Sequence, residues 1–442
     1  MTRDLRRRAL EVHKTTSRKA QSKQASAESS AKNSPVASRT TSRIASRNTS
    51  DDEGDMSDSA TNFSTTSMDD FLQADIDQPM DVWMENLNNR IEQITDRKRS
   101  SVQGREESLA AFSHILMAHY TREEIGKRDS ELIPAILRSI KAGDSEAETV
   151  WALKAIALFI VTCPVDTMYE DVQRAVRRAI DDSKYSAVKV AAIHVLGVAA
   201  FFGGAGQEGI ESVMSFFLEI VESDGEFVDA SDDGNVVTAA LEEWGFLATQ
   251  VEEMEDTAEE FMEALVEQLD SSDVNVQVAS GENIALMFEK SHTELEEDEE
   301  PKDSDIGNEE DEHSAPVVRK RYTIYRREDQ LKQKLVELAG ASSKRLSKKT
   351  RKSLHSNLAD VLNTVEHPNR GPRYSNAIDE ETGKAYGSRM TVGLGGKNDY
   401  LTISTWEQLH RLKALRRVLQ AGLLVHYSEN EIVFDTLPVM LH

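Results

Sequence analysis

Four strongly apolar segments recur along the middle of this chain, and they constrain its fold more than any other feature. Apolar residues recur within each segment at the spacing of a helix. The segments are Glu146–Val161, Ser186–Phe202, Asn235–Val251 and Val274–Glu289, and their starts lie 40, 49 and 39 residues apart. A helix that is apolar on most sides must be buried by its neighbours. A repeat near 40–47 residues with two or three helices per unit is typical of armadillo and HEAT solenoids.

More charged helices are predicted between the apolar ones. They are Glu131–Ala142, Tyr169–Asp181, Gly209–Ser223 and Thr257–Leu269. Short acidic or polar turns separate each partner from the next apolar helix, as at 143–145 and 271–273. Because each helix pair leaves one apolar face uncovered, neighbouring pairs must stack. The sequence therefore predicts an all-α fold, an armadillo/HEAT-like helical solenoid over residues 80–291.

The segments that flank the solenoid differ from it in composition. Residues 1–75 are rich in Ser and Arg with few large apolar residues, so we expect a disordered tail. Residues 292–318 include a run of 12 carboxylates with one lysine, which predicts a solvated acidic linker. An alternative is that this run folds back on a basic segment as a decoy for RNA. Residues 319–442 are then a basic helical C-terminal region.

Three serines in the tail follow an arginine at the spacing that a basic-directed kinase reads. Arg39, Arg43 and Arg47 each precede a serine by three residues, and these serines are the phosphorylation candidates Ser42, Ser46 and Ser50. Phosphorylation adds roughly −1.5 to −2 per site and would cancel the positive charge of the tail. The alternative is a solvated Arg/Ser tract, since such a composition produces these triplets by itself.

The net charge of −26 is unevenly distributed along the chain. Residues 1–50 hold 12 Lys/Arg against 3 Asp/Glu, and residues 313–442 hold 22 against 13, so each end carries +9. The middle of the chain is strongly acidic as a result. Two basic ends can therefore meet a polyanion while the middle repels it.

The C-terminal region is predicted to contain two helices over Arg326–Ala339 and Lys344–Val365. On a helical wheel of the second helix, six cations fall within about 160° and a row of Leu and Val falls opposite. The six cations are Lys344, Arg345, Lys348, Lys349, Arg351 and Lys352. This pattern favours an apolar face that docks and a cationic face that binds a polyanion. A nuclear-import signal and a merely solvated face are the alternatives.

A further helix is predicted after a turn-rich stretch, 366–403, which reads as a loop or hairpin. Ser404 and Glu407 form the S-x-x-E pattern of a capping box at its start, and Gly422 is the expected stop. Leucines occupy one arc, while His410, Lys413 and Arg417 lie opposite at positions i, i+3 and i+7. We expect a second docked helix with a basic outer stripe.

Three parts of the chain carry a resemblance to a known family: the helical array, the segment SKKTRKSLHSNLADVLNTVE and the segment STWEQLHRLKALRRVLQAGLLVHYSENEIVFD. Together they resemble the interferon-related developmental regulator family. The resemblance covers roughly residues 80–291 and 344–437. It implies an armadillo-type fold and no catalytic activity. It also implies either transcriptional co-regulation or an association with ribosomes that restrains translation.

The sequence lacks the usual patterns of catalytic and metal chemistry. HExxH, GxSxG and GxGxxG are absent, and Cys163, the one cysteine, excludes a disulfide framework and any CxxC zinc site. Asp229–Gly234 resembles half of a calcium loop, but Ala240 stands where a bidentate Glu is needed. We therefore expect no enzyme, no metal and no cofactor.

No apolar stretch reaches the ~18 residues that span a bilayer, so no membrane association is expected. We also expect no small-molecule substrate, and a cytoplasmic, possibly also nuclear, location. The favoured hypothesis is a regulator whose nine basic residues named above contact the ribosome through rRNA phosphates. The alternative is a nuclear transcriptional co-regulator whose protein partners bind in the solenoid groove.

Overall fold

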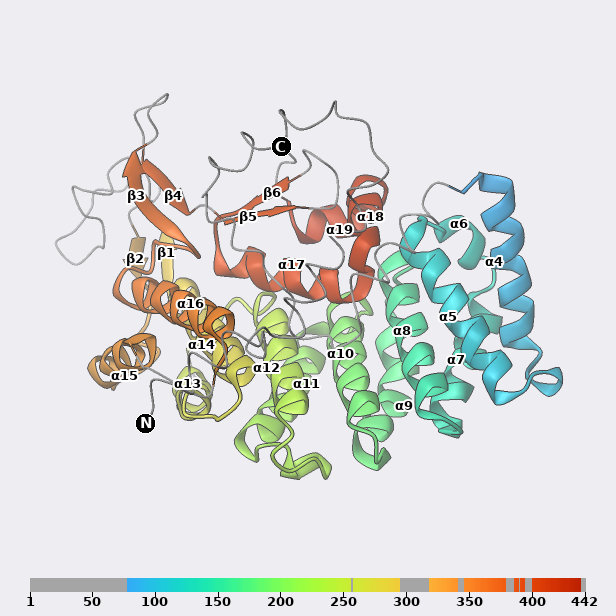
Figure 1. Ribbon diagram of the computed structural model, residues 1–442, viewed down its shortest axis with the longest axis horizontal. Coiled ribbons are helices and arrows are strands. Elements are labelled where there is room, and N and C mark those ends of the chain that lie inside the picture. Colours follow the sequence, from blue (N-terminus) through green and yellow to red (C-terminus); the bar gives the residue numbers. More distant parts are fainter. Residues whose placement is uncertain are drawn as a thin grey trace, which may run out of the picture. The chain divides into compact units, whose positions relative to one another are not determined.

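The computed structural model describes residues 78–255, 257–294, 318–340, 346–378, 385–388, 390–393 and 400–438. All of them belong to one compact unit, Asp58–His442. Within these ranges the chain is mainly helical, and its helices stack in pairs (Figure 1).

Four helix pairs form the solenoid. The outer helices are α7 (Asp129–Ala142), α9 (Met168–Asp182), α11 (Gly206–Glu222) and α13 (Ala258–Gln268). The inner helices are α8 (Glu146–Thr162), α10 (Ser186–Phe202), α12 (Gly234–Ala248) and α14 (Val274–Lys290). Each inner helix packs against the next one along the chain, and each packs against its outer partner. The predicted solenoid of stacked pairs is confirmed.

In the described part of the chain, three further helices come before these pairs. They are α4 (Met80–Thr95), the short α6 (Arg122–Ile125) and, between them, α5 (Val102–Ala118), which packs on both α4 and α8. A 3-10 turn, η1 (Arg97–Arg99), joins α4 to α5, and η2 (Glu226–Val228) follows α11.

Local capping explains why the helices begin and end where the sequence predicts. Ser145 accepts a hydrogen bond from the Glu148 amide at the start of α8, and Asp273 accepts one from the Asn275 amide at the start of α14. These side chains satisfy amide groups that have no partner within the helix. Gly143 ends α7 in the left-handed conformation, at φ 59°. The polar turns between the helices are thus their caps.

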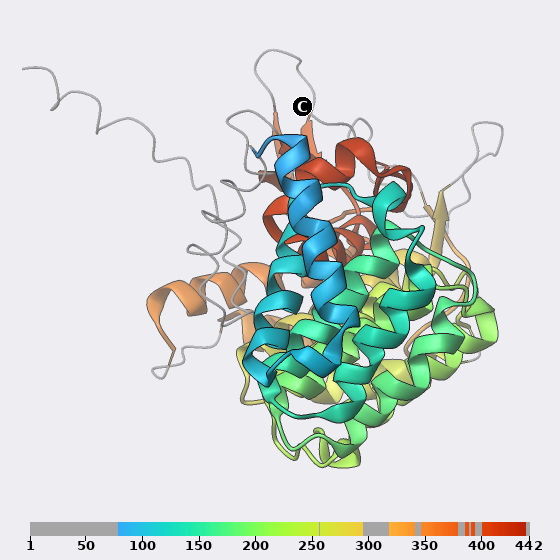
Figure 2. The same ribbon diagram turned by 90° about the vertical axis from the view of Figure 1, so that its right-hand side faces the viewer.

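The C-terminal region packs directly on the solenoid. α15 (Glu328–Gly340) packs on α16 (Lys348–Glu366), which lies against α14, while α17 (Trp406–Leu419) contacts α8, α12 and α14. η4 (Gln420–Gly422), α18 (Leu423–Glu429) and α19 (Glu431–Thr436) follow α17. Figures 1 and 2 show α17, α18 and α19 as one layer across the inner helices. We call these three helices the C-terminal layer.

Three short antiparallel ladders lie beside the helices. β1 (His292–Glu294) pairs with β2 (Val318–Lys320), so both ends of the predicted acidic linker meet. β3 (Tyr374–Ile378) pairs with β4 (Ala385–Ser388), and β5 (Met390–Gly393) pairs with β6 (Tyr400–Ile403). The hairpin alternative for residues 366–403 is therefore correct for the described part. The rest of the acidic linker, and with it the decoy hypothesis, lies outside the described residues.

The start and end of α17 differ from the prediction by one to three residues. Its N-cap is Thr405, which accepts a hydrogen bond from the Gln408 amide, so Ser404 and Glu407 do not form the expected box. The helix ends at Leu419, and Gln420 takes a positive φ of 49°. Gly422 instead allows its backbone to approach α5 closely, since a Cβ there would lie 1.9 Å from the Met117 carbonyl oxygen.

Candidate functional site

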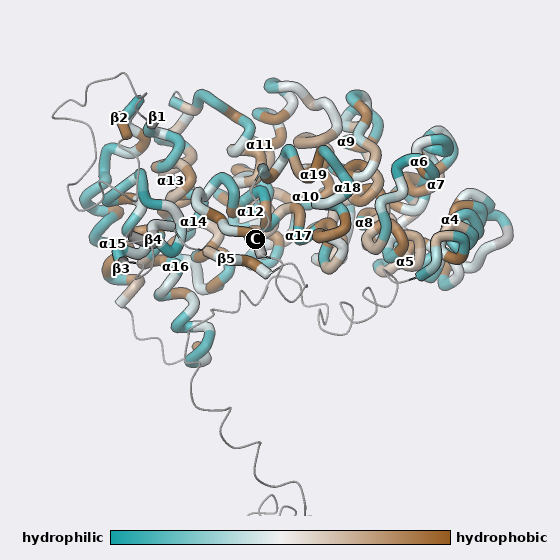
Figure 3. Tube along the Cα trace, turned by 90° about the horizontal axis from the view of Figure 1, so that it is seen from above, coloured by the Kyte–Doolittle hydropathy of each residue, from teal (hydrophilic) through white to brown (hydrophobic). Residues whose placement is uncertain are grey.

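The first turn of α16 carries the most exposed of the predicted contact residues. Lys348, Lys349 and Lys352 are exposed and Arg351 is half-buried. We call these four residues the α16 basic turn. Figure 3 shows the hydrophilic start of α16 extending away from the neighbouring helices.

The opposite face of α16 holds the helix on the solenoid. Leu354, Leu358 and Val361 are buried. Leu358 and Val361 lie over Gly281 of α14, where a Cβ would be 3.3 and 3.4 Å from their methyl groups. The predicted helix with an apolar back and a cationic front is thus confirmed over residues 348–366. Contact of the cationic front with a polyanion stays a prediction.

Several predicted site residues lie outside the described residues. They are Lys344 and Arg345, just before the α16 basic turn, and the phosphorylation candidates Ser42, Ser46 and Ser50 in the tail. Their roles stay predictions.

The expected basic outer stripe on α17 is wrong. His410 is buried, and Lys413 and Arg417 face the inner helices instead of solvent. The Lys413 Nζ lies 2.6 Å from both carboxylate oxygens of Glu282 on α14. Because α17 is packed on both its leucine side and its cationic side, these three residues form no exposed basic stripe.

Arg417 makes the corresponding contact with α12. One terminal nitrogen lies 2.6 Å from Glu243 Oε1, and the other lies 3.4 Å from Glu242. Glu243 also meets His194 Nδ1 of α10 at 2.9 Å. Burial raises the pKa of Glu243, but Arg417 and His194 outweigh that effect and hold it below its usual value. A buried carboxylate is costly unless it is paired, which explains why the cations of α17 turn inward.

The N-terminus of α17 is held by a half-buried glutamate. Glu289, near the end of α14, accepts hydrogen bonds from the Trp406 and Glu407 amides at 2.7 and 3.0 Å. Burial raises the pKa of Glu289 to about 7. At the other end of α17, Lys154 of α8 donates to the Arg417 carbonyl at 2.6 Å, and burial lowers the pKa of Lys154 to about 7.

Sequence reasoning missed these partners on the inner helices, although one signal was present. Glu243 and Glu282 interrupt the buried faces of α12 and α14. An acidic residue on a buried helix face requires a donor or cation from elsewhere in the chain. The cations at 413 and 417, spaced one helical turn apart, were available as those partners.

The position of α17 bears on the alternative hypothesis of a protein-binding groove. Its contacts with α8, α12 and α14 cover the inner-helix face on which an extended partner segment would lie. Along these helices the chain therefore fills its own solenoid face.

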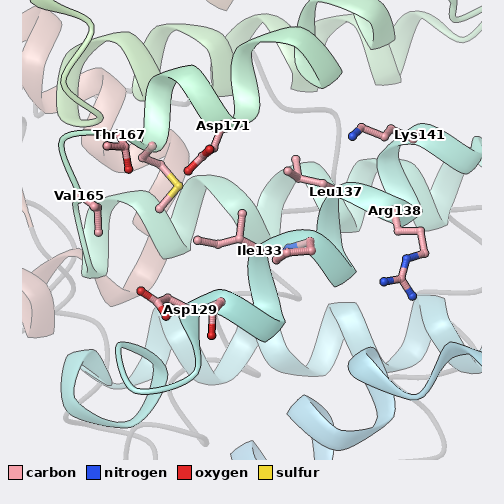
Figure 4. Close-up of a pocket in the computed structure, with 11 residues that line it drawn as sticks. Asp129, Ile133, Leu137, Arg138, Lys141, Val165, Thr167 and Asp171 are labelled. Atoms are coloured by element: carbon pink, nitrogen blue, oxygen red, sulfur yellow. Dashed lines mark hydrogen bonds between the residues drawn. The ribbon is translucent and has the colours of Figure 1, made fainter.

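A cavity of about 490 Å³ opens elsewhere, between α7 and α9. Ile133, Leu137 and Met168 are among its apolar lining residues. Figure 4 shows carboxylates toward one end of it and the basic side chains of α7 toward the other. These charged residues are Asp129, Asp171, Arg138 and Lys141.

Among the described residues, neither a metal site nor a membrane-spanning helix is found. No group of three His, Cys, Asp or Glu side chains among them is arranged to hold a metal ion. None of their helices combines the length and the apolar character needed to cross a bilayer.

Comparison with known proteins places the chain among regulators. The sequence profile described as interferon-related developmental regulator matches residues 48–366, which ends with the last residue of α16. An uncharacterized protein of Schizosaccharomyces pombe is 26% identical over 381 residues, which cover 86% of this chain and 79% of that protein. Interferon-related developmental regulator 2 of Mus musculus is 25% identical over 370 residues, covering 79% of this chain and 72% of the mouse protein. Because the profile spans well over half of its length, this chain belongs to the interferon-related developmental regulator family.

Proposed function

We propose that this chain is a non-enzymatic regulator that associates with ribosomes in the cytoplasm and restrains translation. The observation that carries the proposal is the α16 basic turn, a cationic surface on a helix whose other side is docked on α14. In a chain of net charge −26, solvation of a helix face does not by itself explain four cations within five residues. Such a turn can contact successive rRNA phosphates while the acidic remainder limits nonspecific binding.

The number of cations sets the expected salt dependence. Four phosphate contacts give a slope of log K against log salt of about −3 to −4. This is shallower than nine contacts would give, because His410, Lys413 and Arg417 are turned inward. Lys344 and Arg345 would add up to two contacts if they join the surface.

Sedimentation with ribosomes over a salt series tests this proposal. Lys348→Glu with Lys349→Glu should weaken co-sedimentation at least about tenfold and reduce the slope by about 2. The matched control is Lys98→Glu with Lys184→Glu, which reverses two exposed lysines remote in sequence from α16 and should sediment like wild type. Equal sedimentation of the two double variants would contradict the proposal.

A second candidate function is nuclear co-regulation through a protein partner. The cavity between α7 and α9 favours it, since that apolar surface is open where the inner face is covered. Crosslinking in cells separates the two functions. Recovery of rRNA supports the first, whereas recovery of chromatin proteins, lost on substitution of the half-buried lining residue Ile133→Glu, supports the second.

A further inference from the structure

Ser347 stands at the junction between the preceding connection and the α16 basic turn. It is exposed and serves as the N-cap of α16, with extended backbone angles of φ −61° and ψ 154°. Its Oγ accepts a hydrogen bond from the Thr350 amide at 3.1 Å and lies 2.7 Å from the Thr350 hydroxyl. No other helix holds this hydroxyl among the contacts of the described residues, so it is accessible to an enzyme.

The sequence around Ser347 places cations where a basic-directed kinase reads them. Lys344 and Arg345 stand three and two residues before the serine, and Lys348 follows it. We propose that Ser347 is a phosphorylation site and that its phosphate weakens polyanion binding by the α16 basic turn. This inference rests on the proposed function, because it assigns a regulation to the same surface.

The modification itself is an ordinary phosphoryl transfer from ATP. The Ser347 Oγ attacks the γ-phosphorus, the bond to the β-phosphate oxygen breaks, and ADP leaves. The hydroxyl proton passes to the catalytic carboxylate of the kinase.

Backbone geometry favours Ser347 over the other hydroxyls nearby. Thr350 and Ser353 also follow basic residues, but both lie inside α16. A kinase that binds its substrate in an extended form would have to unwind one or two helical turns to reach them. At Ser347 the backbone is already extended, and of the residue and its next neighbour only Lys348 is helical.

A phosphate at Ser347 would act through charge and leave the helix intact. It brings roughly −1.5 to −2 against the four cations of the α16 basic turn. A negative group at a helix N-terminus is favourable, because it meets unpaired amides and the positive end of the helix dipole. We therefore expect the helix to persist while about half of its local positive charge is cancelled.

The experiment uses the full chain with Ser42, Ser46 and Ser50 all replaced by Ala, so that the tail takes up no phosphate at those positions. The protein is treated with ATP and the catalytic subunit of cyclic-AMP-dependent protein kinase, and sites are mapped by mass spectrometry. Ser100 and Ser101 have cations at the same two positions before them, and Ser101 caps α5, so the map is read serine by serine. We expect phosphate at Ser347, its loss in Ser347→Ala, and its retention in Ser353→Ala and in Ser101→Ala. Failure to incorporate phosphate at Ser347 would overturn the inference.

The effect on binding is read from ribosome sedimentation and from the salt that elutes the protein from heparin. Phosphorylation should reduce the magnitude of the salt slope by about 1.5 to 2. Ser347→Asp and Ser347→Asn are both good N-caps of nearly equal shape. The Asp variant should elute at lower salt than wild type, and the Asn variant should elute with wild type.

Two results would count against the inference and one against the proposed function. Unchanged binding after stoichiometric phosphorylation would remove the regulatory role, as would equal elution of the Asp and Asn variants. If unmodified protein fails to sediment with ribosomes, the proposed function is wrong. Heparin elution then still decides whether Ser347 controls the charge of the turn.

Discussion

Lys413 neutralises a glutamate that the fold buries. Glu282 is 4% exposed, and it receives Lys413 together with the side-chain amide of Asn357 at 2.9 Å. A buried pair of this kind contributes little compared with an apolar pair of the same volume. Removal of one partner is costly, however, because the other charge stays buried and unpaired.

Lys413→Met should therefore lower the free energy of unfolding by about 3 kcal/mol. The double variant Lys413→Met with Glu282→Met should recover most of that loss, since no unpaired charge remains. Urea unfolding followed by circular dichroism measures both. Lys348→Met, an exposed control, should change stability by less than about 0.5 kcal/mol. A Lys413→Met variant as stable as this control would show that the pair does not form.

The residue scale also explains why the predicted cationic face is exposed on α16 but turned inward on α17. A helical wheel shows which side chains share a face, but it does not show what that face meets. At Lys348 the face is exposed. At Lys413 and Arg417 it meets glutamates more than 130 residues earlier in the chain. Only the tertiary packing distinguishes the two cases.

At the scale of elements, the helices were predictable because their signals are local. α10 matches its predicted bounds, and α8 and α14 each extend one residue further. Caps and apolar periodicity fix such bounds within a few residues. The layer formed by α17, α18 and α19 was not predictable, since it depends on buried contacts such as His426 Nε2 with the Leu116 carbonyl at 2.8 Å.

Buried ionisable groups make this C-terminal layer sensitive to pH in two opposing ways. Burial lowers the pKa of His410 and of His426 to about 4, so both stay neutral in the folded state. Their stabilising effect is complete above pH 6.5 and is lost as the pH falls toward 4. Glu289, with its pKa raised to about 7, binds a proton more readily in the folded state. It therefore adds stability as the pH falls from 7 to 4.5.

Glu289→Gln should accordingly make the protein more sensitive to acid. From pH 7 to pH 5, each histidine lowers the free energy of unfolding by about 2 kcal/mol, and Glu289 raises it by about 2 kcal/mol. We expect the variant to lose about 2 kcal/mol more than wild type over that interval. Urea unfolding at both pH values, followed by circular dichroism, measures the difference. Parallel losses in the two proteins would mean that Glu289 does not take up a proton there.

At the scale of the whole molecule, the acidic array and the basic C-terminal region form one packed body within the described residues. The charge partition along the sequence suggested two parts joined by a linker. The structure pairs β1 with β2, docks α16 on α14 and lays α17 across three inner helices. Leucines and buried ion pairs both contribute to that contact, so opposite charge is only part of its stability.

This packing predicts that the two parts stay together after the chain is cut between them. A site for a specific protease inserted within residues 295–317 gives two fragments on cleavage. They should co-elute in gel filtration at 0.1 M salt and still at 1 M salt, because salt screens exposed charges but strengthens rather than weakens apolar contacts. The control treats the chain without the inserted site with the same protease, and this chain should stay intact and elute unchanged. If the fragments separate at 1 M salt, exposed charges hold the C-terminal region in place, and the buried contacts of α17 do not form as described.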